Sequence, residues 1–469
     1  MFNFYELSKF TSCFGVALGV LICAVPVLAI AQGVDFPTDC QLPGRSFEVG
    51  DVPLDMAIGD LDGDGDQDFV TANEVAGTVT VLLNVGDGLF TERTDYVTGD
   101  GARFVVVGDV NNDNRLDIAV ANFDGDTISV LVNNGDGTFA PAVNYDAGIR
   151  PRSTAIGDLD GDGHADIAVA NAGTNNVSIF INNGDGTFAD DVTYGAGTTA
   201  RVVALGDLDA DGDLDLAVAN AAGSDISVLL NNGDGTFAND VLYSVGAAPR
   251  SLVIGDFDGD QDLDIAVASS MSDSLSVLLN NADGTFADAA SIEVPGVFYV
   301  SAADLNNDNS LDLVVAAPGE NEIRTLINNG DGTFIFESVF ETDRLLQTVV
   351  AADVSNNSDL ELIALSAVPN RINVLSSRCT FIGDVNRDRL IDFLDIEPFV
   401  SRIVSGEYQI EADTNRDNAV SFLDVVPFIE ILTGQSEMAW RSRVRIWLKR
   451  SVWGVTLECD EGCCIMCVP

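Results

Sequence analysis

The sequence is poor in the side chains on which most enzymes and nucleic-acid binders depend. It has one histidine, His164, and 22 basic residues against 74 acidic ones, a formal net charge of −52. A single histidine leaves almost no material for histidine-based acid–base or nucleophilic catalysis. So many carboxylates repel nucleic acid and anionic membranes, and both are therefore poor partners. Clustered carboxylates can instead hold hard cations such as calcium.

Long apolar runs are missing after the N-terminus. Lys9 precedes an apolar run over residues 14–30, which ends at the small residues Ala29 and Ala31. This pattern indicates a secretory signal peptide over residues 1–31. A retained membrane anchor is the alternative, and Pro26 within the run disfavours it. We expect the mature chain to be secreted or displayed at the cell surface, where disulfides are stable.

The acidic residues recur with a period of about 49 residues. The string DLDGDGDQD begins at Asp60, and related strings begin at positions 109, 158, 207, 256, 304 and 353, so the chain holds seven copies. A second string, NNGDGTF, stands at a fixed place in the repeat, as at residues 133–139. Each copy contains four short runs of β-strand character, and the Asn-Gly-Asp-Gly sequence is typical of a tight hairpin turn. Four strands per repeat predict propeller blades, and a linear stack of sheets is the alternative.

The two ends of the repeat region predict a closed ring. The seventh copy lacks the NNGDGTF turn and the fourth strand, whereas residues 39–50 form a lone strand before the first full copy. A strand donated from the N-terminus would complete the last blade and remove its exposed edge. The predicted fold is mainly β, a seven-bladed β-propeller over residues 36–378, followed by a small α module.

Two cysteines occupy matching places at this junction. In the register of the repeat, Cys40 and Cys379 lie three residues apart across a hairpin turn, close enough for a disulfide. We predict that a Cys40–Cys379 bond replaces the missing turn and contributes about 4–5 kcal/mol. Two unpaired buried thiols are the alternative.

The acidic loops have the spacing of calcium sites. In the pattern D-x-D-x-D-G-x-x-D, positions one, three, five and nine supply side-chain oxygens in a tight turn, as calcium requires. Polar turns without metal are the alternative, but six such loops would crowd like charges without a cation. The seventh copy has Ser355 and Asn357 in place of acids, and we expect no tight site there. The predicted ligands of about six sites are Asp60, Asp62, Asp64 and Asp68; Asp109, Asn111, Asp113 and Asp117; Asp158, Asp160, Asp162 and Asp166; Asp207, Asp209, Asp211 and Asp215; Asp256, Asp258, Asp260 and Asp264; and Asp304, Asn306, Asp308 and Asp312.

The acidic loop paired with NNGDGTF resembles FG-GAP repeats of the VCBS kind, whose integrin α-subunit relatives are seven-bladed propellers. The resemblance covers residues 36–378. It implies calcium loops at the bottom of the blades and ligand binding on the opposite, top face. It does not imply one ligand, because relatives serve adhesion, carbohydrate binding and some lyase reactions.

A second duplicated pattern occupies residues 383–434. Two twelve-residue loops of EF-hand type, each followed by a helix-like apolar stretch, lie 29 residues apart and predict one or two further calcium sites. The pair resembles a type I dockerin, which implies a cohesin-like protein receptor. The pair Phe393-Leu394 departs from the dockerin pattern, and packing on its own propeller is the alternative. The predicted ligands are Asp384, Asn386, Asp388, Asp392 and Asp395, then Asp413, Asn415, Asp417, Ser421 and Asp424.

Residues 435–469 have a different composition. All three tryptophans, five basic residues and four cysteines lie in this tail. The pattern fits either a basic amphipathic helix with a disulfide- or metal-bearing tip or an atypical tail without a defined role.

Four arginines mark a candidate ligand face. Six residues before the first loop aspartate, successive repeats carry Arg103, Arg152, Arg201 and Arg250; thirteen residues after it they carry Asn73, Asn122, Asn171 and Asn220. If the strand before each loop is innermost, these residues lie at the top face near the channel. Arginine suits carboxylates or sulfates and asparagine suits hydroxyls. We therefore predict a glycan or an acidic protein loop as ligand. The alternative is that the arginines pair with neighbouring acids and the asparagines merely end strands.

These observations favour a secreted, calcium-binding recognition protein over an enzyme. The alternative is a polysaccharide-degrading lyase or hydrolase, because dockerins often accompany such enzymes. The repeated carboxylates are explained by calcium loops, however, and no separate acid pair stands out. A purely structural matrix component is a third hypothesis.

Overall fold

The computed structural model describes residues 41–86, 88–91, 93–376, 447–448, 456–460 and 463–468. The chain divides into two compact units, residues 38–378 and the two ends of the chain together. Each unit is described by itself. The predicted signal peptide, the Cys40–Cys379 bond and the dockerin-like module at residues 383–434 lie outside the described residues.

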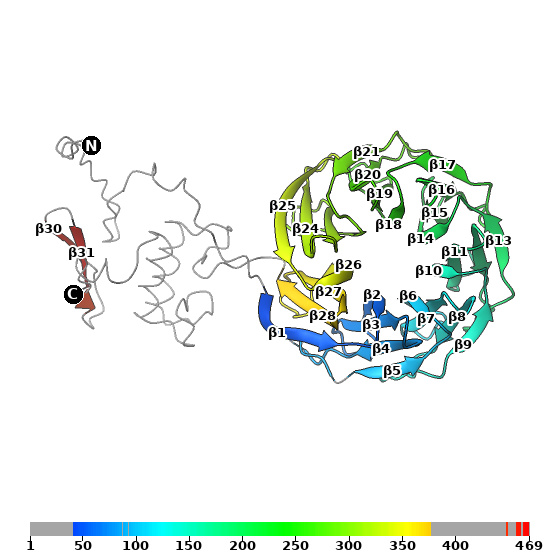
Figure 1. Cartoon of the computed structure of the whole chain (residues 1–469), viewed down its shortest axis with the longest axis horizontal. Helices are drawn as coiled ribbons and strands as arrows, with labels where there is room; N and C mark the ends of the chain where they lie inside the picture. The colour runs from blue at the N-terminus through cyan, green and yellow to red at the C-terminus, as the bar shows by residue number, and fades with distance from the viewer. Residues whose placement is uncertain are drawn as a thin grey trace. The chain divides into compact units, whose positions relative to one another are not determined.

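The larger unit is a ring of seven four-stranded antiparallel sheets (Figure 1). This confirms the predicted propeller. In six blades the chain runs from the innermost strand outward. Those six blades are β2 to β5 (Pro53–Gly59, Asp68–Asn73, Thr78–Leu82, Thr94–Val97), β6 to β9 (Ala102–Gly108, Asp117–Asn122, Thr127–Leu131, Val143–Asp146), β10 to β13 (Pro151–Gly157, Asp166–Asn171, Asn176–Phe180, Val192–Gly195), β14 to β17 (Ala200–Gly206, Asp215–Asn220, Asp225–Leu229, Val241–Ser244), β18 to β21 (Pro249–Gly255, Asp264–Ser269, Ser274–Leu278, Ala290–Glu293) and β22 to β25 (Tyr299–Ala303, Asp312–Ala317, Glu322–Asn328, Phe334–Glu341).

The seventh blade joins the two ends of the propeller. Its strands β26 (Arg344–Ala352), β27 (Glu361–Val368) and β28 (Asn370–Ser376) are completed by β1 (Gln41–Glu48) on the outside. Strand β1 pairs antiparallel with β28, with Phe47 opposite Ile372. The ring closure by an N-terminal strand is therefore confirmed. Its physical reason is that β28 would otherwise present unpaired backbone groups at an open edge.

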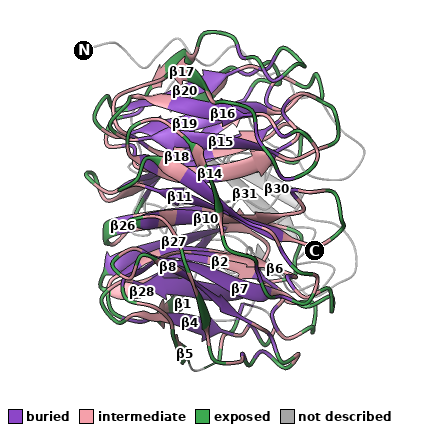
Figure 2. Ribbon diagram, turned by 90° about the vertical axis from the view of Figure 1, so that its right-hand side faces the viewer, coloured by how far each residue is buried: buried purple, intermediate pink, exposed green. Residues whose placement is uncertain are grey.

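The hydrophobic core lies between the blades. Second strands such as β7 and β11 are fully buried along their length, because both of their faces pack on neighbouring sheets. Buried residues occupy the middle of each blade, while loops and outer strands are exposed (Figure 2). Aromatic pairs reinforce the junctions: the outer-strand Tyr96 contacts Phe139 of the next blade with ring centroids 5.5 Å apart.

The NNGDGTF turn also links neighbouring blades. The side-chain amide of Asn133 donates to the carbonyl of Leu61 in the acidic loop of the preceding blade, at 2.7 Å, and to that of Leu116 in its own blade, at 2.9 Å. We call this contact the inter-blade clip. It recurs at five other positions, Asn84, Asn182, Asn231, Asn280 and Asn328. The clip of Asn84 reaches Val354 of the seventh blade and so crosses the closure of the ring.

The described part of the second unit is a small sheet. It consists of β29 (Trp447–Leu448), β31 (Cys463–Val468) and β30 (Thr456–Asp460), in that order, with Cys459 opposite Cys464. Most of the basic stretch to which the helical alternative applied lies outside the described residues, and the described residues of the tail are strands. Apolar and β-branched residues on both sides of the short Asp460–Cys463 connection favour a hairpin over a helix.

Candidate functional site

The acidic loops connect the innermost strand of each blade to the second strand. In four loops the carboxylate oxygens of three aspartates lie within 4.8 Å of one another. The fold thus brings together three of the four predicted ligands of each of these loops, and the groups do not include Asp64, Asp162, Asp211 and Asp264. The four groups are Asp60, Asp62 and Asp68; Asp158, Asp160 and Asp166; Asp207, Asp209 and Asp215; and Asp256, Asp258 and Asp260.

Backbone hydrogen bonds hold these carboxylates in place. In the first blade, Asp60 accepts the N–H groups of Gly63 at 2.7 Å and Gly65 at 3.0 Å, which wraps the loop around its first aspartate. Gly63 and Gly65 have positive φ angles of 81° and 94°. In the second blade Asn112 and Asn114 adopt the same left-handed conformation, so the loop keeps its shape where glycine is replaced.

The ninth loop position connects the candidate metal site to the blade. Asp68 is fully buried and accepts the N–H of Leu61 at 2.7 Å and of Asn84 at 2.7 Å. Burial, with a smaller contribution from the nearby Asp62, outweighs the lowering by the two hydrogen bonds and raises the pKa of Asp68 to about 6. Burial and the neighbouring Asp64 likewise raise the pKa of Asp62. A bound cation would relieve this cost, and an all-oxygen donor set suits a hard cation. The arrangement therefore fits a metal ion.

Two loops have a different charge balance. In the second blade Arg115 forms a salt bridge with Asp113 at 3.5 Å, so a basic side chain already faces this loop. In the sixth blade the amide of Asn306 donates to Asp308 at 2.9 Å. Both loops have an amide at the third position, and their internal donors compete with a cation for the same oxygens.

The predicted arginines line a cavity at the opposite end of the innermost strands. The cavity has a volume of about 90 Å³. Its wall includes the residue six positions before the loop aspartate in every blade, so the repeat builds a ring of seven side chains. In blade order the ring is Leu54, Arg103, Arg152, Arg201, Arg250, Phe298 and Gln347.

A β-bulge explains how these side chains face the channel. In the third blade, Pro151 pairs with Asn171 and Ser153 with the adjacent Ala170, so Arg152 has no partner on the second strand. The register shifts at the same place in five other blades, at Leu54, Arg103, Arg201, Arg250 and Gln347. A bulge bends the strand and redirects the extra side chain. The sequence specifies which residues form the ring, but the register of the first two strands determines that their side chains point into the channel.

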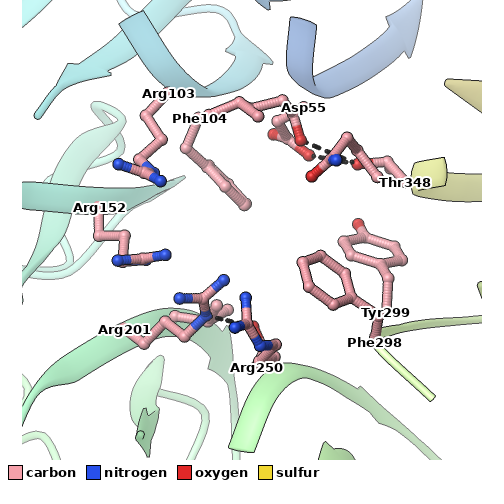
Figure 3. A pocket seen from close by; sticks show the side chains of 12 residues that line it. Asp55, Arg103, Phe104, Arg152, Arg201, Arg250, Phe298, Tyr299 and Thr348 are labelled. Atoms are coloured by element: carbon pink, nitrogen blue, oxygen red, sulfur yellow. Dashed lines mark hydrogen bonds between the residues drawn. The ribbon is translucent and has the colours of Figure 1, made fainter. Parts of the chain in front are cut away.

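The arginines differ in their partners. Arg103 forms a salt bridge with Glu74 of the preceding blade at 2.8 Å, as the pairing alternative predicted. Arg201 donates through Nε to the carbonyl of Arg250 at 3.1 Å, and Arg250 donates through Nε to Ser270 at 2.9 Å. Within the described part of the chain, Arg152, Arg201 and Arg250 have no carboxylate partner. Their guanidinium groups gather on one side of the cavity (Figure 3).

Burial and mutual repulsion lower the pKa values of these arginines. Burial, then the neighbouring Arg103 and Arg250, lowers the pKa of Arg152 to about 9, although Glu74 opposes the shift. Burial, then Arg152 and the other arginines, lowers the pKa of Arg201 well below its ordinary value. Each arginine disfavours the charge of the next. An anion placed among them would remove this repulsion.

The prediction for the four asparagines needs correction. Asn73, Asn122, Asn171 and Asn220 are fully buried and do not line the cavity. Their side-chain amides donate to hydroxyl groups of the third strand: that of Asn122 reaches Thr127 at 3.0 Å and Ser129 at 2.8 Å. They are buried because the neighbouring glycine, such as Gly99, packs directly on the amide. These residues hold the top hairpins together.

Of the twelve residues that line the cavity, the sequence predicted the four arginines; the eight that it did not predict include Asp55 and Tyr299. Asp55 and Tyr299 occupy the position after the ring residue, where Ser153 and Ser251 stand in other blades. Asp55 is only 3% exposed and accepts the N–H of Val105 at 3.1 Å and the hydroxyl of Thr348 at 3.2 Å. An acid at a position that elsewhere carries hydroxyl or apolar side chains is the signal that could have revealed it.

The comparisons with known proteins define the class of this molecule. The sequence model of the FG-GAP-like repeat family matches residues 60–120, 109–169, 158–218, 207–267, 256–315 and 304–364. Each match runs from one acidic loop through the next, and together they cover more than half of the chain. The chain belongs to the FG-GAP-like repeat family. The comparison with curated proteins finds no match.

Solved structures of proteins with diverse functions are similar to this chain. An Agrocybe aegerita lectin that recognises non-reducing terminal N-acetylglucosamine is 26% identical over 61% of this chain and 78% of its own, with a TM-score of 0.45. BBS1N in complex with ARL6DN is 15% identical over 70% and 98%, with a TM-score of 0.51. A streptogramin B lyase is 13% identical over 71% and 96%, with a TM-score of 0.50. At these identities the similarity shows the fold alone, and it establishes no enzymatic activity.

Proposed function

We propose that this protein is an exported, calcium-stabilised recognition protein that binds an anionic ligand in the arginine-lined cavity. The observation that carries the proposal is the convergence of arginines from four consecutive blades on one cavity. Of the ten arginines between residues 93 and 371, five form salt bridges. Among the described residues, three of the other five line this cavity.

The distribution of charge supports an anionic ligand. Aspartates and glutamates outnumber basic residues more than threefold in this chain, so carboxylate partners for arginine are plentiful. Arg152, Arg201 and Arg250 nevertheless have no carboxylate partner among the described residues. Arg201 and Arg250 bond through Nε alone, which leaves the terminal N–H groups of their guanidinium groups available to a ligand. A carboxylate, sulfate or phosphate group would satisfy these donors.

Calcium is the cation that best fits the acidic loops. The oxygen donors and tightly turned backbone match its coordination, and the loops fasten the first two strands of each blade. We assign calcium a structural role, because the loops and the arginine cavity lie at opposite ends of the innermost strands.

Export and docking complete the proposal. The N-terminal pattern of residues 1–31 supports secretion, and no helix among the described residues is long and apolar enough to cross a bilayer. The dockerin-like pattern of residues 383–434 would attach the propeller to a cohesin-like receptor.

Anion binding to arginine variants of the full chain tests the proposal. Binding of sodium acetate, sulfate and glucuronate is measured by isothermal titration calorimetry with calcium present. Arg152→Ala and Arg201→Ala should each weaken binding of the preferred anion about 10- to 100-fold, the loss expected for hydrogen bonds to a charged group.

Arg344→Ala is the matched control, because Arg344 is exposed and lies outside the cavity. It removes the same charge and should leave the affinity unchanged. If no anion binds the folded chain, or if Arg344→Ala weakens binding as much as Arg152→Ala, the proposed function is wrong.

A further inference from the structure

The cavity wall has two chemically different halves. On one side lie the guanidinium groups of Arg152, Arg201 and Arg250, and on the other lie Asp55, Thr348 and Tyr299 (Figure 3). A ligand that carries only negative charge would match the first half and oppose the carboxylate of the second. Negative charge alone therefore does not make a ligand complementary to the whole wall.

The second half offers hydrogen bonds to a neutral polar group. Asp55 accepts two hydrogen bonds, from Val105 and Thr348, and a carboxylate has room for about four. Within the described residues the hydroxyl of Tyr299 has no hydrogen-bond partner. It points toward Thr348 (Figure 3). An acceptor and a donor thus stand side by side, as recognition of an alcohol group requires.

Apolar surface lies between the two polar halves. Phe298 and Phe104 line the cavity. Arg250 lies over the ring of Phe298, with its guanidinium carbon 4.4 Å from the ring centroid. This contact fixes the orientation of the arginine and the ring together. The C–H groups of a ring-shaped ligand would pack on such a surface while its substituents reach the polar groups.

The size of the cavity limits the ligand to a small unit. A space of about 90 Å³ within the ring of innermost strands is too small for a polyanionic chain to lie along its length. A sulfate or phosphate ion alone would satisfy the arginines and leave Tyr299 without a partner. The ligand needs one negative group and, across a ring, one or more hydroxyl groups.

We infer that the cavity binds a single acidic sugar residue of the uronate class, with its carboxylate on Arg152 and Arg201 and its ring hydroxyls on Asp55 and Tyr299. The inference rests on the proposed function and specifies its ligand. The sugar is either free or at the end of a glycan chain, because the same chemistry serves both.

Calorimetry with the full chain separates charge from sugar recognition. Sodium glucuronate should bind at least about tenfold more tightly than acetate, and glucose should bind more weakly than either. Glucuronate carries both the carboxylate and the ring hydroxyls, whereas acetate has only the carboxylate and glucose only the hydroxyls. A glucuronate-terminated oligosaccharide that binds more tightly than the monosaccharide would identify a chain end as the source, and equal affinity would identify the free sugar.

Tyr299→Phe supplies a variant that spares the fold, since the deleted hydroxyl bonds to no described residue. It should weaken glucuronate binding about 5- to 10-fold, the loss of one neutral hydrogen bond, and leave acetate binding unchanged. Arg152→Ala should weaken the binding of both. An unchanged thermal midpoint would confirm that each variant is folded.

The outcomes separate the inference from the proposed function. If glucuronate binds no more tightly than acetate while Arg152→Ala weakens both, the sugar assignment fails and anion binding stands. If an acidic peptide binds more tightly than glucuronate, the ligand is a protein segment and the sugar assignment is likewise overturned. If none of these ligands binds, both fail.

Discussion

At the scale of single residues, one strand position supplies a side chain from every blade to the wall of the central cavity. The ring position carries leucine, four arginines, phenylalanine and glutamine in the seven blades. In six of these blades a bulge at this position directs side chains of different kinds into the channel. Because the blades share one backbone arrangement, substitutions at this position would change the chemistry of the cavity wall while leaving the blade intact. The following position contributes Asp55, whose burial has a consequence for stability.

Asp55 should make the stability of the protein depend on pH. Burial raises the pKa of its carboxyl to about 7, against lowering by its hydrogen bonds to Val105 and Thr348. The folded state therefore holds this proton more tightly than the unfolded state, so stability falls as pH rises from about 4 to about 7. Asp55→Asn should remove this loss. The difference in the free energy of unfolding between the variant and the native protein should therefore shift in favour of the variant by about 2 to 4 kcal/mol from pH 5 to pH 8.

Urea unfolding at both pH values, with calcium saturating, measures this difference. Asp146→Asn is the control, because Asp146 is exposed on an outer strand. If the Asp55→Asn and native curves stay parallel with pH, the carboxyl does not titrate as argued.

At the scale of elements, a turn motif performs two tasks. The NNGDGTF string closes the hairpin between the third and fourth strands, as its composition predicts. Its first asparagine also reaches the acidic loop of the preceding blade. The seventh blade has no such turn, and the predicted Cys40–Cys379 bond would stand at that place. Because of the inter-blade clip, the stability of each blade depends on its neighbour, although the sequence repeat corresponds to a single blade.

Loss of one clip should destabilise the whole propeller. Asn133 is buried and its amide serves two carbonyl groups, so Asn133→Ala leaves both carbonyls without a partner. We expect a fall in the free energy of unfolding of about 2 to 3 kcal/mol by urea denaturation. Asn134→Ala is the matched control in the same turn. Asn134 is exposed and bonds Thr138 at 3.0 Å, and the change should cost about 0.5 kcal/mol or less. Equal effects would contradict the inter-blade role.

At the scale of the whole molecule, charge and closure act together. The seven sheets form a ring that the two ends of the repeat region complete, and the acidic loops lie around one end of it. The pKa values of Asp62, Asp160, Asp209 and Asp258 are raised by burial and by neighbouring carboxylates. Calcium in these loops would turn a repulsive cluster into a cross-link between two strands of each blade.

Removal of calcium should therefore lower the thermal stability of the entire propeller. One ion at a hundred times its dissociation constant adds about 2.7 kcal/mol, and several loops contribute. A chelator should lower the unfolding midpoint, and calcium should restore it. Magnesium at the same concentration should restore less, because it demands a stricter geometry. Asp160→Asn should reduce the calcium content found by elemental analysis. A midpoint insensitive to the chelator would contradict the metal assignment.

The strands, the blades and the number of repeats were predictable from the sequence. The 49-residue period, the alternating apolar runs and the turn strings are local patterns, and six of the seven blades form from one stretch of chain. Strand β1 was also predictable, because the missing strand at one end matched a surplus strand at the other. The acidic loops carry their ligand pattern within nine residues, which is why four aspartate clusters formed as expected.

Only the tertiary structure determined which polar residues at the top of the blades line the cavity and which are buried. The arginines and the asparagines each recur at a fixed position of the repeat, and the sequence predicted both at the ligand face. The bulge directs the arginines into the cavity, whereas the packed glycine buries the asparagines. Asp55 and Tyr299 belong to blades that are distant in sequence, and only the closed ring brings them together. The local pattern of each repeat determined the blade; the angle between blades, set by side-chain packing, determined the cavity.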